Sequence, residues 1–519
     1  MKRGCRGIGK RRIAAALAFA SLLSGCAAPT RHAPRVPLRT EAPLAGLPAA
    51  TAGWPAAEWW KDFHDAQLDA LVELATARAP ALDVAAARYR QAAAGVDAAR
   101  ADSRPELTGL ASASRAKIGS GKPNAAAANG GSTTGGAGST SGNGSGAAAS
   151  AGGGFTLPSY VTSVVALADF SYDFDWWGAH RAAIESAIDQ EHAALAERSA
   201  SLAALQYGVA AAYFDWLGIE LRLTQAAHST DVNARLVAIA QARVNRGIDS
   251  PQTLEAARAQ LAAARTQGAQ LEGAASLDLV QIATLCGVAP AELPPLSARA
   301  LPTPDTRLPD DARVHLLARR PDIVASRWQV QAASRDVDQA RAAFFPDVSL
   351  NALGAVLRSL PTPGPDSTLR AGSVGLSAML PLFDGGRRQA AFDRGEAALD
   401  LAIAQYNQTV LDAAQDVNRQ TVLLGALAKE RQEHAAALAA AAAAYDQAQA
   451  RARRGVDDPR QTLGALGQLI AQRDAAVSLD AQALATQVSL VHALGGGYRS
   501  DSGAEQPPTT LDSTQEATR

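Results

Sequence analysis

The chain is poor in the residues that metal sites, disulfide frameworks and catalytic centres require. Its 519 residues include 3 cysteines and 8 histidines, and aromatic residues make up 5% of the total. The histidines show no metal-ligand spacing, no Ser/His/Asp or Cys/His signature is recognisable, and no glycine-rich phosphate loop is found. The formal net charge of -1 provides no excess of positive charge for binding nucleic acid. We therefore expect no metal, no cofactor, no nucleic-acid partner and no enzymatic activity.

The N-terminus lacks an apolar run long enough to span a bilayer, yet it has the parts of a secretory signal. Basic residues precede the short apolar segment 13–23, and the tetrapeptide LSGC follows at 23–26. This tetrapeptide resembles the bacterial lipobox, which implies removal of residues 1–25 and acylation of Cys26. Because Ala27 rather than aspartate follows, the same resemblance implies the outer membrane. An ordinary signal peptide with an incidental cysteine is the alternative.

The remaining cysteine and the segment after the signal have simple expected roles. Cys5 leaves with the signal and Cys26 carries lipid, so Cys286 stays alone and no intrachain disulfide is expected. Cys286 lies at the end of an expected helix, where we expect it to be a small buried residue with a structural role. Residues 26–57 are rich in proline and alanine and are expected to form an extended tether.

The stretch YVTSVVALADFSYDFDWWG (160–178) alternates between two residue types. Its even positions are mostly apolar, whereas its odd positions from Asp169 onward are polar. This period of two predicts a strand with acidic residues facing water. The aromatic end, Trp176 and Trp177, favours a lipid-facing membrane strand with an interfacial belt, although packing against the following helix would also explain it. The Gly/Ser/Ala-rich segment 119–154 is an expected long hairpin loop.

After Gly178 the apolar period becomes that of a helix. The heptad-like seam consists of Ile184, Ile188, Leu195, Leu202, Val209 and Tyr213. No proline interrupts the chain before Pro251, so the stretch predicts a rod about 100 Å long at roughly 1.5 Å per residue. A rod of this length cannot bury its seam in a small globule and needs neighbouring rods.

This strand-and-rod unit occurs twice, which indicates an internal duplication. The pairs at an offset of 208 are Gly178–Gly386, Gly247–Gly455, Pro251–Pro459 and Gly287–Gly495, and those at 241 are Pro80–Pro321, Arg100–Arg341 and Pro105–Pro346. The expected organisation is a lipoprotein signal peptide at 1–25, a tether at 26–57, a first repeat at 58–290, a Pro-rich linker at 291–310, a second repeat at 311–497 and a disordered tail at 498–519. The first repeat is expected to have strands at 106–116 and 160–176 and rods at 178–246 and 252–287. The second is expected to have strands at 347–357 and 372–380 and rods at 386–453 and 461–494.

Four membrane strands cannot close into a barrel, and an open sheet edge in lipid leaves backbone groups unpaired at a cost of several kcal/mol each. We therefore expect the barrel to be shared between chains. Two chains would give about eight strands with a filled interior, whereas three would give about twelve and leave a lumen. The rods would then pack side by side and extend the barrel as a helical tube.

The motifs also carry a family resemblance. The chain resembles TolC/OprM-like outer-membrane factors, the NodT-type efflux lipoproteins, through LSGC, FDWWGAHR, RGIDSP, RRGVDDP, ARRPDI, ARAAFFPDVSL, LPLFDGGRR and HALGGGY, in the order of that family and over residues 54–498. The resemblance implies a mainly α-helical homotrimer with a shared twelve-stranded β-barrel and a long periplasmic α-barrel. It implies the exit duct of a tripartite pump that exports drugs or other small toxic compounds. The partners would be a periplasmic adaptor and an inner-membrane exporter, commonly of the resistance-nodulation-division type.

In this family the far tips of the helical tube meet the adaptor and form the closed aperture. The corresponding tip residues are Arg246, Gly247, Asp249 and Pro251 in the first turn and Arg454, Gly455, Asp457, Asp458 and Pro459 in the second. Each tip aspartate would form a threefold ring that can pair with tip arginines as a latch. The acidic position common after the second tip is missing from LGALGQ (463–468), so Asp457 or Asp458 is its expected substitute.

Two other functions remain open at the level of the sequence. One is a structural coiled-coil lipoprotein of the cell envelope that forms no channel, against which the alternating strands and the duplicated unit argue. The other keeps the duct but places it in a type I secretion system, a choice that the sequence of the duct does not decide.

Overall fold

The computed structural model describes residues 29–44, 53–117, 160–304, 312–362, 364–456 and 458–499. Its described part forms two compact units. Arg100–His180 and Ala342–Gly385 build a sheet unit, while Pro29–Ala99, Arg181–Arg341 and the chain after Gly386 build a helical unit. Each unit takes segments from both expected repeats, so the duplication is interleaved in space and does not produce two consecutive domains.

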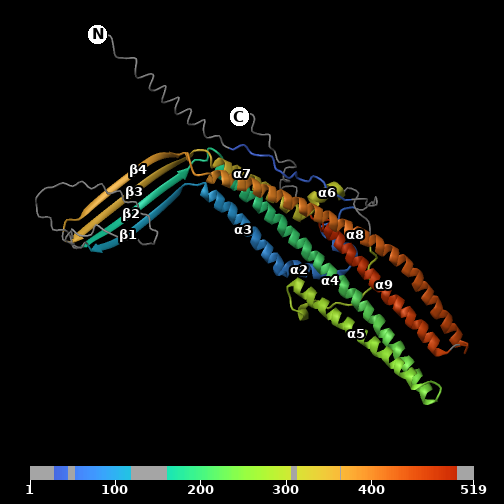
Figure 1. Cartoon of the computed structure of the whole chain (residues 1–519). Coiled ribbons are helices and arrows are strands. Elements are labelled where there is room, and N and C mark those ends of the chain that lie inside the picture. The colour runs from blue at the N-terminus through green and yellow to red at the C-terminus, as the bar shows by residue number, and fades with distance from the viewer. Residues whose placement is uncertain are drawn as a thin grey trace, which may run out of the picture. The chain divides into compact units, whose positions relative to one another are not determined.

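The sheet unit holds one four-stranded antiparallel sheet in the order β1-β2-β3-β4 (Figure 1). The strands are β1 (Glu106–Lys117), β2 (Tyr160–Asp173), β3 (Asp347–Thr362) and β4 (Ser367–Met379). The outer strands β1 and β4 are exposed along their whole length, and each pairs with one strand within the described residues. The sheet therefore has two open edges, as the sequence predicted for a shared barrel.

Two strand boundaries in the second repeat differ from the prediction. β3 continues to Thr362 instead of 357, and β4 begins at Ser367 instead of 372. The reason is the ladder: Leu360 and Thr362 pair with Thr162 and Tyr160 of β2, so the proline-containing run that looked like a loop continues the sheet. In the first repeat β1 reaches Lys117 rather than 116, and β2 ends at Asp173 rather than 176, after which Phe174 N still donates to Val348 O at 2.8 Å.

The helical unit contains two short helices before each strand pair and one long helical hairpin after it (Figure 1). The helices are α2 (Ala66–Arg78), α3 (Pro80–Asp102), α4 (Ala179–Asn245), α5 (Pro251–Cys286), α6 (Ala312–Arg319), α7 (Pro321–Ala342), α8 (Arg387–Arg453) and α9 (Pro459–Ala493), with 3-10 turns η1 (Trp59–Phe63) and η2 (Pro290–Glu292). Both α4 and α8 have 67 residues, which is about 100 Å of helix. Within the described residues, no helix combines the length and hydrophobicity that crossing a bilayer requires.

The duplication is visible in the backbone conformation as well as in the sequence. Glycines 208 residues apart adopt the same left-handed conformation at the same structural point. Their φ values are 77° and 87° for Gly178 and Gly386, 70° and 72° for Gly247 and Gly455, and 67° and 103° for Gly287 and Gly495. A side chain is strained at such φ values, which explains why the repeat keeps glycine at these six positions.

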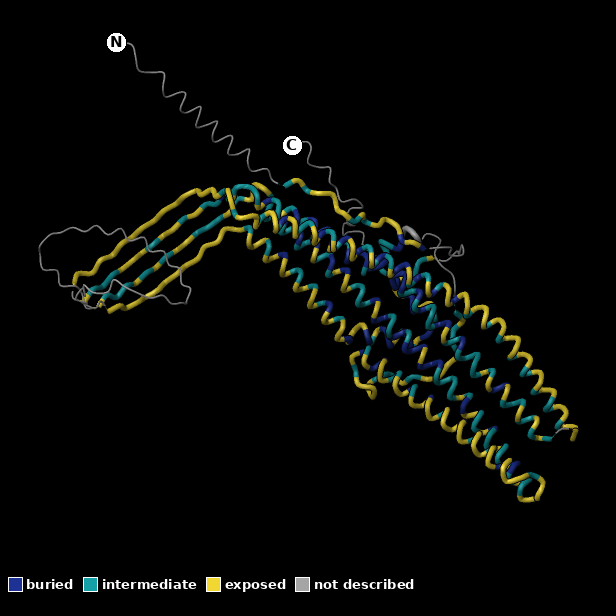
Figure 2. The backbone as a smooth tube through the Cα atoms, viewed as in Figure 1, coloured by how far each residue is buried: buried dark blue, intermediate teal, exposed yellow. Residues whose placement is uncertain are grey.

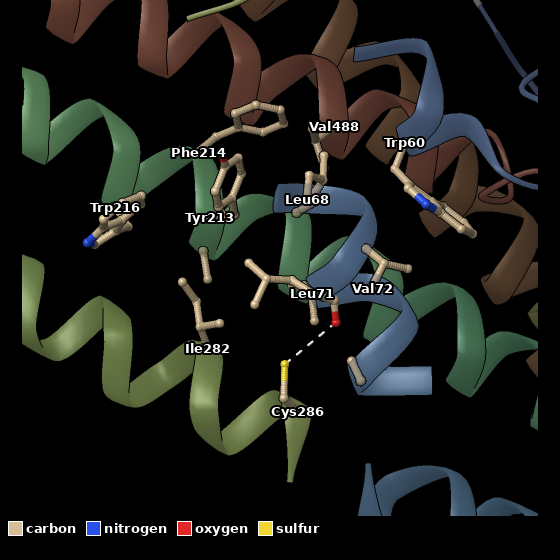
Figure 3. Close-up of a cluster of buried hydrophobic side chains, with 14 of the residues drawn as sticks. Trp60, Leu68, Leu71, Val72, Tyr213, Phe214, Trp216, Ile282, Cys286 and Val488 are labelled. Atoms are coloured by element: carbon tan, nitrogen blue, oxygen red, sulfur yellow. Dashed lines mark hydrogen bonds between the residues drawn. The ribbon is translucent and has the colours of Figure 1, made fainter. Parts of the chain in front are cut away.

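A cluster of buried side chains joins η1, α2, α4, α5 and α9 (Figure 3). Tyr213 Oη donates to Asp65 Oδ2 at 2.7 Å inside it, and burial raises the pKa of the Tyr213 hydroxyl. Cys286 is free and fully buried, and its Sγ lies 3.7 Å from Leu71 O. The sequence predicted this structural role for Cys286. Figure 2 shows that burial falls off from this cluster toward the ends of the long hairpins.

The described part of the expected tether lies against the helical unit. Residues 29–44 are extended, and three backbone N–H groups donate to side-chain oxygens of α8. These bonds are His32–Glu396 at 2.8 Å, Arg35–Asp400 at 3.0 Å and Arg39–Asn407 at 2.9 Å. The acceptors are spaced along one face of α8, and Ala42 and Leu44 are buried. The segment is therefore a bound strap over this range, because α8 supplies the acceptors that an extended backbone lacks.

The glycine at the end of α5 makes a testable prediction about stability. A Cβ on Gly287 would lie 2.5 Å from Arg78 O and 2.8 Å from Pro80 Cδ, where α2 turns into α3. Gly287→Ala should therefore destabilise the folded subunit by roughly 1–3 kcal/mol through strain and collision. The measurement is the thermal unfolding temperature of the purified assembly, which should fall.

Gly268→Ala is the matched control. Gly268 lies within α5, and nothing lies within 4 Å of an added Cβ. The substitution should leave stability unchanged or raise it by up to about 1 kcal/mol, because alanine is the better helix former. Equal unfolding temperatures for both variants would contradict the proposed packing of Gly287.

Candidate functional site

The turns that end the two long hairpins share one backbone design. After α4, Gly247 N donates to Val244 O at 2.9 Å and Ile248 N donates to Arg243 O at 2.9 Å. After α8, the same two bonds recur from Gly455 and Val456 to Ala452 and Arg451, at 2.9 and 3.1 Å. This is the Schellman arrangement, in which a left-handed glycine reverses the chain and satisfies the last helical carbonyls.

The return helices begin equally sharply. Pro251 and Pro459 occupy the first helical positions of α5 and α9, where a missing N–H costs nothing. Asp458 caps α9 by accepting a bond from Arg460 N at 2.9 Å, whereas Ser250 forms no such side-chain cap on α5. The sequence therefore fixes both tips locally, through glycine at the end of one helix and proline at the start of the next.

Four charged side chains join the two tips within one chain. Asp249 receives two hydrogen bonds from Arg243, at 2.8 and 3.1 Å, and lies 3.4 Å from Arg460 Nη1. Arg460 also pairs with Asp458 at 2.8 Å, and Asp458 lies 4.0 Å from Arg243. The two arginines and two aspartates alternate, so each carboxylate lies near both guanidinium groups. We call these four residues the tip ion cluster.

The charges of the cluster support each other. Hydrogen bonding to Arg243 lowers the pKa of Asp249, and hydrogen bonding to Arg460 lowers the pKa of Asp458. Because these pKa values are depressed in the folded state, the cluster contributes its stabilisation above the usual carboxyl range, about pH 4, and loses it as pH falls through the depressed values. The cluster is therefore intact at neutral pH.

The sequence predicted the tip aspartates but not their partners. The expected arginines, Arg246 and Arg454, are exposed and take part in no ion pair within the described residues. The partners are Arg243, one turn before the tip, and Arg460, at the start of the return helix. Asp457 lies outside the described residues.

The tip ion cluster breaks the duplication that built the tips. At an offset of 208, Asp458 corresponds to Ser250 and Arg460 corresponds to Gln252. One acid–base pair of the cluster therefore belongs to the second repeat alone. An exposed aliphatic residue lies on each tip beside the cluster, Ile248 with 57% and Val456 with 66% of its surface accessible. This combination of an ion-paired junction and exposed apolar residues suits a surface that separates or receives a partner.

The two predicted belt residues lie at the end of β2, within the sheet unit. Trp177 stacks on Phe345 with ring centroids 4.6 Å apart, and its Nε1 donates to Pro346 O at 2.8 Å. Trp176 is 64% exposed and lies beside Phe174. The position of both side chains in a membrane stays a prediction.

Cys26 lies outside the described residues. Among the described side chains, no group of three His, Cys, Asp or Glu residues is arranged to hold a metal.

Comparison with known proteins gives consistent matches along the chain. A family model described as "Outer membrane efflux protein" matches residues 71–288 and 313–496. The multidrug resistance outer membrane protein MdtP of Escherichia coli strain K12 is 31% identical over 490 residues, covering 93% of this chain and 96% of that protein. MdtQ of Escherichia coli O157:H7, which carries the same description, is 30% identical over 494 residues, with 92% and 96% covered.

Solved structures agree. The outer membrane protein VceC from Vibrio cholerae is 27% identical with a TM-score of 0.66, covering 86% of this chain and all of that one. The outer-membrane channel OprN is also 27% identical, with a TM-score of 0.71 and coverage of 91% and 99%. These matches confirm the expected fold class, a mainly α-helical subunit that contributes four strands to the shared barrel of a trimeric channel.

The tip ion cluster predicts a pH-dependent junction between the two hairpins of one chain. Spin labels at Ile248→Cys and Val456→Cys should give a narrow distance distribution at pH 7. The distribution should broaden as pH falls below about 4, when the carboxylates protonate and release both arginines. Pulsed electron-electron spin resonance on the purified assembly measures this distribution.

Asp249→Asn should broaden the distribution already at pH 7, because the neutral amide removes one partner from both arginines. Glu255→Gln is a suitable control, since its ion pair with Arg258 lies within α5 and joins no tips. A distribution that is the same with and without the Asp249→Asn substitution at every pH would refute the junction.

Proposed function

Because the chain belongs to the outer membrane efflux protein family and is the exit duct of an efflux system, we propose that it completes a tripartite exporter. A periplasmic adaptor and an inner-membrane pump of the resistance-nodulation-division type are its partners. The cargo is drugs or other small toxic compounds, which agrees with the descriptions of MdtP and MdtQ as multidrug resistance proteins. Transport through the duct is passive and needs no catalytic group, since the inner-membrane pump supplies the energy.

The observation that carries this proposal is the construction of the hairpin tips. Each tip ends in a hydrogen-bonded turn with an exposed aliphatic residue and an exposed arginine, Ile248 with Arg246 and Val456 with Arg454. Apolar side chains ringed by charge are typical of a protein-binding surface. The adaptor docks on this surface, with Gly247, Pro251, Gly455 and Pro459 fixing its shape.

The tip ion cluster gives the same surface a way to close. Asp249 and Asp458 hold the two hairpins of one chain together through Arg243 and Arg460. Three chains around an axis repeat this junction three times and narrow the periplasmic mouth of the duct. Asp457 joins the acidic ring there. Adaptor binding opens the mouth by offering the arginines and aspartates other partners, which separates the hairpins.

Two features fix the duct to the outer membrane. The barrel strands cross the bilayer, with Trp176 and Trp177 at its periplasmic interface, where indole rings are favoured. Acylated Cys26 inserts into the same membrane and leads into the strap at residues 29–44. The bound strap supports this arrangement, because it keeps the chain that follows the lipid close to the helical unit.

The docking surface predicts the effect of changing the tip glycines. Gly247→Val with Gly455→Val should impair efflux, because a β-branched residue is strained at φ values of 70° and 72° and distorts both turns. The barrel should remain in the membrane at normal abundance. Drug susceptibility of a strain that depends on this duct measures the effect, together with the amount of trimer in the outer membrane.

Gly425→Val is the matched control, since Gly425 lies within α8 and nothing lies within 4 Å of an added Cβ. It should leave drug resistance close to the native level. Undiminished resistance in the tip double variant at normal abundance would count against the tips as the docking end.

The lipid anchor makes a separate prediction. Cys26→Ser should abolish incorporation of labelled palmitate and leave the signal peptide uncleaved, because the lipobox cysteine is both the acylated residue and the cleavage point. Trimers should still form, since the strands and helices expected to associate begin well after this residue. Persistent lipid labelling of the variant would refute the assignment of Cys26.

A further inference from the structure

The charged residues of the sheet are separated by sign, face and end. Side chains alternate between the faces along each strand, and the register places Val164, Phe170 and Val374 on one face. Within the strand limits, every basic residue lies on this apolar face, and every acidic residue lies on the other. The basic residues are Arg115, Lys117, Arg358 and Arg370, and the acidic ones are Glu106, Asp169, Asp173 and Asp347.

The two sets also lie at opposite ends of the strands. The acidic residues lie toward the end where the strands join the helices, and the basic residues lie toward the end with the β3–β4 turn. The helices of this family extend into the periplasm, so the turn end of the sheet faces the outside of the cell. The apolar face, which the aromatic residues Phe170 and Tyr172 share, faces lipid. The basic residues therefore lie on the lipid face near the outer leaflet.

The three arginines of the strands fall on one level once the strands are tilted as in a closed barrel. Arg115, Arg358 and Arg370 lie on the ladder rows of Thr162, Val164 and Ala166 of β2. Between Arg115 on β1 and Arg370 on β4, which are three strand spacings apart, the position along the strands therefore shifts by four residues. With about 3.4 Å per residue and about 4.8 Å between strands, this diagonal slopes by about 43°. The strands of membrane barrels tilt by about 35–45° from the barrel axis. If the strands tilt in the right direction, this tilt brings the diagonal row of arginines to one height in the membrane.

The direction agrees because of chain chirality. Phe174 N donates to Val348 O, so even-numbered residues of β2 form the hydrogen-bonded pairs with β3. For L-residues this puts β3 to the left of β2 when the lipid face is toward the viewer and the turn end is up. The sheet twist makes barrel strands lean to the right at the top. A line parallel to the membrane therefore crosses β4 farther from the turn end than it crosses β1. Arg115, Arg358 and Arg370 drop in this order, and the three side chains form a level row.

The row lies at the depth of lipid headgroups. Measured along the membrane normal, the arginine row and the aromatic residues Tyr172 and Phe174 are about 25 Å apart on the tilted β2. This distance equals the height of the outward apolar band of a membrane barrel. Arginine on the lipid face is costly at the middle of the bilayer and much less costly near the interface, which favours the headgroup level. The aromatic residues mark one interface, and the arginines mark the other.

The local contacts leave the row able to bind an anion. Arg115 Cζ lies 4.8 Å above the ring of Tyr160, which orients the guanidinium without neutralising it. Arg358 pairs with Asp366 at 3.1 Å, but the two side chains are 55% and 51% exposed. Arg370 is exposed and has no ion pair with any described residue. Lys117 lies one step closer to the turn end, 6.0 Å from the Tyr160 ring centroid.

We propose that Arg115, Arg358 and Arg370, with Lys117, form a collar that binds the phosphate groups of phosphorylated glycolipid in the outer leaflet. Guanidinium groups bind phosphate in a bidentate manner, and three copies of the row encircle a trimer. Acyl chains of the same lipid lie on the apolar face below the collar, over residues such as Phe170 and Val374. The collar fixes the height of the barrel in the membrane from the outside. It goes beyond efflux and rests on the family's membrane orientation.

The test is a titration of the purified trimer with bisphosphorylated lipid A, followed by native mass spectrometry. Dephosphorylated lipid A and phosphatidylglycerol are the comparison lipids. The native protein should bind lipid A most tightly, and added salt should weaken binding. Each Arg→Gln change should weaken it by about fivefold, because one basic group near an anionic lipid surface contributes roughly 1 kcal/mol. Arg115→Gln with Arg358→Gln and Arg370→Gln should reduce it most.

The matching variants separate the collar from general effects. Arg→Lys at the same three positions should retain most of the binding, whereas the exposed helix variant R88Q/R90Q/R265Q should bind like the native protein. Channel conductance should be the same in all variants, so a failure of the collar is distinct from a failure of the duct. Unchanged binding by the collar triple variant, or equal binding of dephosphorylated lipid A, would overturn the proposal. If the triple variant does not assemble, the affinity of the single variant Arg370→Gln for lipid A is the test. An affinity equal to that of the native protein would overturn the proposed collar.

Discussion

The structure depends on a constraint that one chain cannot meet alone. β1 and β4 each present an unpaired edge within the described residues, and unpaired backbone groups are too costly to leave in hydrocarbon. The 67-residue helices α4 and α8 have the same problem with their apolar seams toward the hairpin tips, because within the chain α8 has no buried residue after Leu424 and α4 has only Val232 and Ala240 after Ala226. Association around an axis meets both needs together. The hole along that axis is the consequence, and the family uses it as a duct.

The parts of the fold that local chemistry determines could be predicted from the sequence. Gly247, Gly287 and their equivalents stand at left-handed positions, and proline begins each return helix, so helix ends are correct within a few residues. The period change at Gly178 separates strand from helix because side chains repeat differently in the two. The extension of β3 through Pro361 could not be predicted, since it depends on pairing with β2, a strand about two hundred residues away.

The partners at the tips were unpredictable for a similar reason. Asp249 pairs with Arg243 six residues earlier, which local spacing could suggest, but Arg460 comes from the other hairpin. Duplication reasoning fails there as well, because position 252 is glutamine where the second repeat has Arg460. The two contacts between the tips, Asp249 with Arg460 and Arg243 with Asp458, each use one of the residues in which the second repeat differs from the first.

Charge is arranged differently at the hairpin tips and on the sheet. At the tips, opposite charges within one chain hold the two hairpins together, and water and salt keep such exposed pairs weak. On the sheet, charges of one sign gather on one face and cannot satisfy each other. Within the four described strands, Arg370 has no acidic neighbour on its own face, whereas Asp169 and Asp173 occupy the opposite one. A charge that these strands leave without a partner at a defined depth is best explained by an anion that the membrane supplies. The tip ion cluster therefore pairs its charges within one chain, whereas the lipid face of the sheet leaves Arg370 for an anion from outside it.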